Sequence, residues 1–109
     1  MTERKKEFLK DLCCRLPYNT MVLTCGCGTT RKIKLDYQVY YLAEQGIFRI
    51  MPYLFPMSSM TEEQKSRIEF YAFMKEYHKI VELYNENHID YRGFIEKGLS
   101  IDATNLNIY

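Results

Sequence analysis

Hydrophobic positions near the start of the chain recur at helical spacing. The apolar side chains form one stripe, made of Phe8, Leu9, Leu12, Cys13 and Leu16. We expect an amphipathic helix over residues 2–16 that ends at Pro17. The cationic side chains fall mostly on its other side, at Lys5, Lys6, Lys10 and Arg15. A helix of this length is marginally stable alone, so it must pack on other elements.

The pattern then changes to short β-type runs separated by turn residues. Residues 21–25 are apolar and β-branched, and Gly26 and Gly28 suit a tight reversal after them. Residues 31–35 alternate, which directs Ile33 and Leu35 inward. Residues 37–42, rich in Tyr, and residues 47–50 complete three or four antiparallel strands.

A second helix is expected from about residue 60. Ser59 with Glu62, and Thr61 with Gln64, have the spacing of a capping box. Pro52 and Pro56, just before, force an extended, turning path. Positions three and four apart then predict a core-facing stripe of Phe70, Phe73, Met74, Tyr77, Ile80, Val81 and Tyr84.

The length of this second helix is a problem for a compact domain. Unbroken to Asn87 it would be about 40 Å long, against a domain diameter of roughly 35 Å. We expect either a break near residues 75–78 or a projecting end, whose aromatic stripe would bind a partner.

The tail has breakers at Gly93 and Gly98, and several of its side chains should pack back onto the core: Phe94, Ile95, Leu99 and Ile101. Residues 105–109 are expected to fray unless Leu106 or Tyr109 docks. Together the elements predict a single α+β domain over residues 1–109. A small antiparallel sheet, from about Asn19 to Tyr53, would be packed by the N-terminal helix and by the longer helix of the C-terminal half.

Composition and charge argue against some classes of function. The net charge of +1 argues against strong bulk attraction to nucleic acid or anionic lipid. The chain has no run of 18 uncharged apolar residues, and its first residues mix charges. We therefore expect a cytoplasmic protein with no membrane span.

The four cysteines form two close pairs, Cys13-Cys14 and Cys25-Gly-Cys27. Reduced thiols are expected in the cytoplasm, and a one-residue spacer does not suit a structural zinc site. We assign no metal, cofactor or catalytic residue, since no phosphate loop or nucleophile motif occurs. His88 lies at an expected helix end, where an imidazolium would interact favourably with the helix dipole.

Two groups of residues are candidates for protein contact. The first group is Tyr53 and Phe55, in addition to the aromatic stripe of the second helix. The other is Asp90, Tyr91 and Arg92 on a turn, which could be a recognition point or an internal salt-bridge clamp; we favour the clamp.

A nucleic-acid face is the alternative. Arg31, Lys32 and Lys34 precede Tyr40 and its neighbouring tyrosines, so a basic and aromatic sheet face would form if residues 37–42 were a strand. Three cations make a weak electrostatic footprint, and the aromatics do not follow an RNP pattern.

Three segments carry a resemblance: Lys10–Tyr18, Pro52–Gln64 and Asn85–Leu99. They resemble a group of short uncharacterised proteins encoded in phages, prophages and other mobile elements of gut bacteria. The resemblance implies a genomic setting and carries over no activity, and it implies that the three segments meet in one structural unit. Our interpretation is a non-enzymatic accessory protein that acts through protein contact, with a homodimer as one form. A small nucleic-acid-binding module is the alternative.

Overall fold

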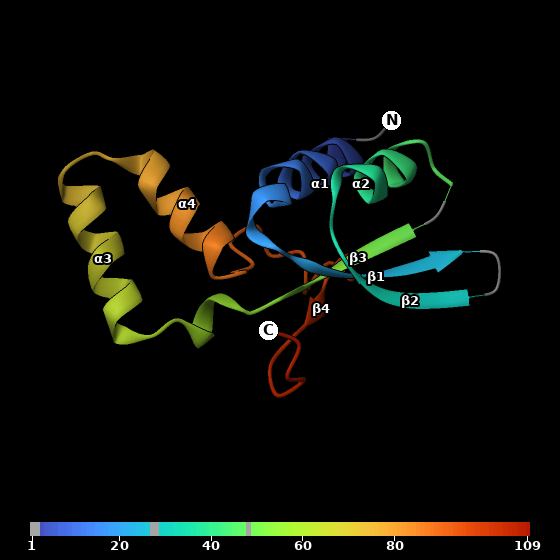
Figure 1. The fold of residues 1–109 in the computed structure, drawn as a ribbon. Coiled ribbons are helices and arrows are strands. Elements are labelled where there is room, and N and C mark those ends of the chain that lie inside the picture. The colour runs from blue at the N-terminus through green and yellow to red at the C-terminus, as the bar shows by residue number, and fades with distance from the viewer. Residues whose placement is uncertain (1–2, 27–28, 48) are drawn as a thin grey trace.

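The computed structural model describes residues 3–26, 29–47 and 49–109 (Figure 1). The fold class is α+β, as the sequence predicts, and its elements in chain order are α1 (Glu3–Cys14), η1 (Leu16–Tyr18), β1 (Met21–Gly26), β2 (Thr29–Lys34), α2 (Tyr37–Glu44), β3 (Arg49–Leu54), η2 (Met57–Ser59), α3 (Glu62–Phe73), α4 (Tyr77–Glu86) and β4 (Ile101–Asp102). The strands form one sheet in the order β2-β1-β3-β4. Pairing is antiparallel except between β3 and β4, which are parallel.

Helices α1 and α2 cover one face of the sheet (Figure 1). The core between them is formed by Leu9, Leu12, Val22, Leu35, Val39, Ala43 and Ile50. The expected start of α1 at residue 2 lies outside the described residues, as do Cys27, Gly28 and Phe48. Pro17 lies in the short 3-10 turn that follows α1. Arg15, expected on the polar side, is fully buried.

The strand predicted over residues 37–42 is wrong, because this segment is helix α2. Asp36 caps the helix, and its carboxylate accepts a hydrogen bond of 2.8 Å from the Val39 amide. The two buried side chains of α2, Val39 and Ala43, are four residues apart, which is the helical period. The cap and this spacing outweigh the β propensity of Tyr and Val.

Strand β3 continues through Pro52 to Leu54, beyond the run predicted over residues 47–50 and close to the predicted end of the sheet at Tyr53. Pro52 is opposite Val22 of β1, and the next residue but one, Leu54, accepts a hydrogen bond from Ala103 on the β4 side. Backbone groups two residues apart point the same way along a strand, so the missing N–H of Pro52 also faces away from β1. The proline therefore removes no bond from the β1–β3 ladder.

The second helical region is a hairpin of two helices. Thr61 and Gln64 form the predicted capping box at the start of α3, whereas Ser59 bonds back to the carbonyl of Pro56. The chain breaks where expected: Lys75 has a φ of 58°, and Glu76 N–H donates to Tyr71 O at 2.8 Å. This is a Schellman ending with a lysine in the left-handed position.

The hairpin lies beside the sheet and does not cover it (Figure 1), and the molecule measures 47 Å along its longest axis. None of the described side chains of α3 is buried. The predicted core stripe is therefore wrong for Phe70, Phe73, Met74 and Tyr77, which are at least half exposed.

The tail packs back onto the body, as expected. Phe94 is buried, and Gly93 and Gly98 both have positive φ. Residue Ile89 forms a parallel bridge with Phe55, which extends the sheet beyond the end of β3. Tyr109 also docks, through its hydroxyl group.

Candidate functional site

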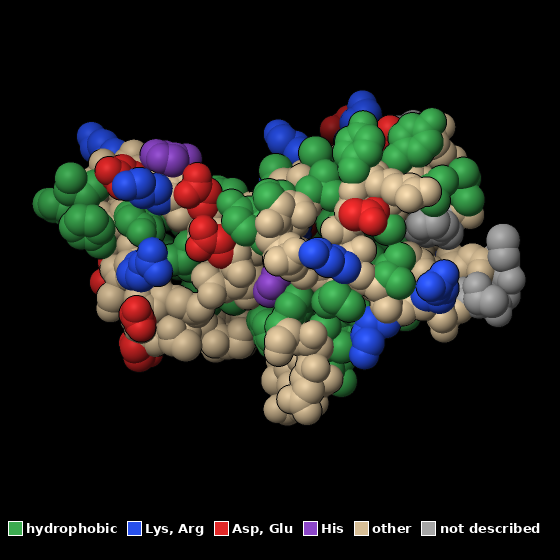
Figure 2. Space-filling view, viewed as in Figure 1, with side chains coloured by type: hydrophobic (Ala, Val, Ile, Leu, Met, Phe, Trp, Pro, Cys, Tyr) green, Lys and Arg blue, Asp and Glu red, His purple; other side chains and the backbone are tan. Residues whose placement is uncertain are grey.

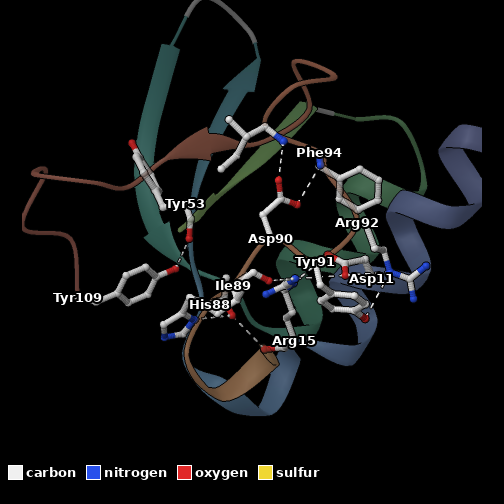
Figure 3. Close-up of polar contacts among 12 residues, drawn as sticks. Asp11, Arg15, Tyr53, His88, Ile89, Asp90, Tyr91, Arg92, Phe94 and Tyr109 are labelled. Carbon is white, nitrogen blue, oxygen red and sulfur yellow. Dashed lines mark hydrogen bonds and ion pairs between the residues drawn. The ribbon is translucent and has the colours of Figure 1, made fainter. Parts of the chain in front are cut away.

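A buried ion-pair cluster joins α1 to the segment after α4 (Figure 3). The Arg15 guanidinium donates to the Asp11 carboxylate at 2.8 Å and to the carbonyl of Ile89 at 2.7 Å. Arg92 approaches the other Asp11 oxygen at 3.2 Å. Asp11 and Arg15 are fully buried and the Arg92 side chain is 24% exposed, so one buried carboxylate pairs with two cations. The sequence analysis missed this pair, although four residues separate it along one helix face.

Asp90 shapes the next turn. It is buried, and its two carboxylate oxygens accept hydrogen bonds of 2.9 Å from the amides of Phe94 and Ile95 (Figure 3). The ring of Tyr91 stacks on Tyr84 with centroids 5.0 Å apart. Arg15 and Arg92 lie 5.6 Å and 5.2 Å from the Tyr91 ring. Asp90 thus bonds to backbone amides, whereas Arg92 forms its ion pair with Asp11.

His88 and Tyr109 lie next to each other, beside the ion-pair cluster (Figure 3). Their rings stack with centroids 3.7 Å apart. The Tyr109 hydroxyl accepts a hydrogen bond from Met21 N–H and donates one to Tyr53 O. Met21 and Tyr53 adjoin Val22 and Pro52, the last pair of the β1–β3 ladder, so the Tyr109 hydroxyl links the two strands there.

Partial burial shifts the pKa of both ionisable side chains, although Tyr109 remains 45% exposed. Burial, and then the positive charge of Arg15, lower the pKa of His88 to about 4. Burial raises the pKa of Tyr109 to about 12. The expected imidazolium at the helix end is therefore wrong, because His88 is neutral near pH 7.

The hairpin of α3 and α4 has a group of exposed apolar side chains. We call it the hairpin surface and define it by Phe70, Phe73, Met74, Tyr77 and Val81, whose exposed fractions run from 38% to 82%. Figure 2 shows hydrophobic side chains gathered at the end of the hairpin, with charged groups of both signs around them. Exposed apolar patches of this kind mark interaction sites.

The other contact candidates are less accessible. Tyr53 is buried, and Phe55 is half-buried with its ring 5.8 Å from that of Tyr109.

The proposed basic and aromatic face is not assembled. Arg31, Lys32 and Lys34 are exposed on the edge strand β2, but Tyr40 lies on helix α2. Its ring packs against the core cluster and its hydroxyl lies 3.2 Å from Glu44. Cations and tyrosine therefore come from different elements of the fold.

Cys13 and Cys14 are exposed and Cys25 is half-buried, each as a free thiol. Within residues 3–26, 29–47 and 49–109, no three His, Cys, Asp or Glu side chains are placed to hold a metal ion. In the same residues, no helix has the length and apolar character of a membrane span.

The chain matches no protein-family model, no curated protein and no solved structure.

Proposed function

We propose that the protein acts through protein contact and that the hairpin surface binds a second copy of this chain. The observation that carries the proposal is the exposure of five large apolar side chains on α3, α4 and the turn between them, a hairpin that adds nothing to the core between α1, α2 and the sheet. The setting in a phage or mobile element belongs to this proposal and rests on the resemblance of the three segments.

The area of the hairpin surface suits a dimer. A large aromatic side chain buries about 150–250 Å² when it is fully covered. At the observed exposures the five side chains present on the order of 500 Å². Two such surfaces in contact would bury about 1,000 Å², which is near the lower limit for a specific interface.

The charges around the hairpin surface favour a second copy over a strongly charged partner. Both signs occur there, with Glu69 and Glu76 close in sequence to Lys75 and Lys79. A two-fold contact places the same patch against itself, so opposite charges from the two copies can meet. A rim of one sign would instead repel its own copy.

Helix α3 would gain most from such a contact. It has twelve residues and no buried side chain among those described. Helices of this length are marginal without tertiary packing. Covering Phe70 and Phe73 with a second hairpin would give α3 the apolar contacts that the monomer lacks.

The test is the mass of the protein in solution, measured by light scattering after size exclusion. We expect a dimer, with twice the chain mass of 13.1 kDa, and a monomer for Phe73→Glu. Tyr41→Glu is the matched control, because Tyr41 is an exposed aromatic on α2, and it should remain a dimer. A monomeric wild type at about 100 μM would overturn the proposal, since specific interfaces bind more tightly than this. Equal dissociation by both substitutions would place the contact elsewhere.

A further inference from the structure

A cavity of about 380 Å³ lies between the first half of α1, the end of α2 and the start of β3. Its floor is apolar and includes Phe8, Ile50 and Leu99. In Figure 1 these elements are at the opposite end of the molecule from the hairpin. The cavity is therefore separate from the surface proposed for protein contact.

Three cationic side chains border this apolar floor: Arg4, Lys5 and Arg49. No Asp or Glu occurs among the described residues that line the cavity. The guanidinium of Arg49 donates to the carbonyl of Gly98 at 3.3 Å, which ties it to the tail. An apolar cavity bordered by cations is complementary to an anionic amphiphile: the apolar lining matches its tail, and the cations match its negative head group.

We infer that this cavity binds a small organic anion with an apolar tail. The tail lies on the floor formed by Phe8, Ile50 and Leu99, and the anionic head group meets Arg4 and Arg49. A guanidinium can hold a carboxylate or a phosphate through paired hydrogen bonds. The volume is near the lower end of the roughly 300–1,000 Å³ found for small-molecule sites, which suits a ligand with one chain or ring.

The test uses three ten-carbon probes, decanoate, decyl phosphate and decanol, in ¹H–¹⁵N NMR titrations of the full chain. We expect saturable shifts of amides in α1 and β3 with one or both anions, and binding of decanol about tenfold weaker. The anion that binds more tightly identifies the head-group class, carboxylate or phosphate. Arg49→Gln should weaken binding of that anion about fivefold or more, because it removes one charge-assisted contact.

Arg31→Gln is the matched control, because it removes the same charge from an exposed site on β2. It should leave the affinity unchanged. Equal binding of decanol and both anions would overturn the inference, because the cations would then have no role. Shifts confined to α3 and α4, or no saturable shift up to about 5 mM, would also overturn it. None of these outcomes depends on the oligomeric state, so this inference and the dimer can fail separately.

Discussion

The imidazole of His88 lies in a site that disfavours its protonated form. It follows α4 in the left-handed conformation, with a φ of 58°, and its ring lies flat against that of Tyr109. Burial and the nearby charge of Arg15 lower its pKa from 6.5 to about 4. The neutral ring can stack on Tyr109 without a desolvated charge, so His88 has a packing role at neutral pH.

This shift predicts a pH dependence of stability. Between pH 6.5 and 4 the unfolded state binds a proton that the folded state excludes, so stability falls as the pH falls through this window. We expect a loss of about 1 kcal/mol between about pH 7 and pH 5, after discounting the full shift for partial exposure. Denaturant unfolding of the wild type and of His88→Gln measures this, and the variant should lose the dependence.

The second histidine provides the control. His78 is exposed on α4, so His78→Gln should keep the pH dependence of the wild type. Identical slopes for the wild type and His88→Gln would contradict the lowered pKa.

At the scale of elements, both hairpin helices end without glycine. Lys75 and His88 occupy the left-handed position after α3 and α4, and each is followed by the long backbone bond of a Schellman ending. A left-handed conformation costs a residue with a side chain free energy that glycine does not lose. The two turns are therefore locally strained, and the left-handed residues at Lys75 and His88 redirect the chain after each helix.

Relieving one of these turns should stabilise the hairpin. We expect Lys75→Gly to raise the stability of α3 by about 0.5–1 kcal/mol, because glycine adopts this φ freely. Lys65→Gly, in the interior of the same helix, should lower it by about 1 kcal/mol. Native-state hydrogen exchange of the α3 amides measures both. Lower protection in Lys75→Gly than in the wild type would contradict the assigned turn.

The elements that the sequence predicts correctly are those that local sequence rules determine. The capping box at Thr61 and the alternation over residues 31–35 follow rules that depend on near neighbours. Both are confirmed, since Ile33 is half-buried and Leu35 is buried while the lysines next to them are exposed. Only the length of the helix predicts the break near Lys75, because no glycine marks it. Residues 37–42 have β propensity, and the prediction of a strand there overlooks the Asp36 cap and the helical spacing of Val39 and Ala43.

The candidate sites were harder to predict for a physical reason. Asp11 and Arg15 differ from surface residues only in what packs over them, and their partners come from residue 89 onward. Exposure of the hairpin surface likewise depends on where α3 lies relative to the sheet. Contacts distant in sequence decide both, and local periodicity contains no information on them.

At the scale of the whole molecule, the segments Lys10–Tyr18, Pro52–Gln64 and Asn85–Leu99 contact one another. Asp11 and Arg15 of the first contact Ile89 and Arg92 of the third, and Phe55 of the second forms a bridge with Ile89. The cluster ties α1 and β3 to the chain that returns from the hairpin. Two of its charged members, Asp11 and Arg15, are fully buried, so the joint depends on the pairing of this carboxylate with this guanidinium.

Removing the shared carboxylate should therefore affect the entire fold. Asp11→Ala leaves Arg15 buried without a counter-charge, and we expect a loss of about 3–5 kcal/mol in the free energy of unfolding. Glu3→Ala breaks an exposed ion pair with Lys6 on the same helix and should change it by less than about 0.5 kcal/mol. Denaturant unfolding monitored by circular dichroism compares the two variants.

A loss of 3–5 kcal/mol is a large part of the roughly 5–15 kcal/mol that holds a small domain folded, so Asp11→Ala could fail to fold at all. Asp11→Asn keeps the shape and one hydrogen-bond acceptor, and should fall between the wild type and Asp11→Ala. If Asp11→Ala were as stable as Glu3→Ala, the cluster would not be the joint between the segments. The docking of α1 would then depend on its apolar contacts alone, chiefly those of Leu9 and Leu12.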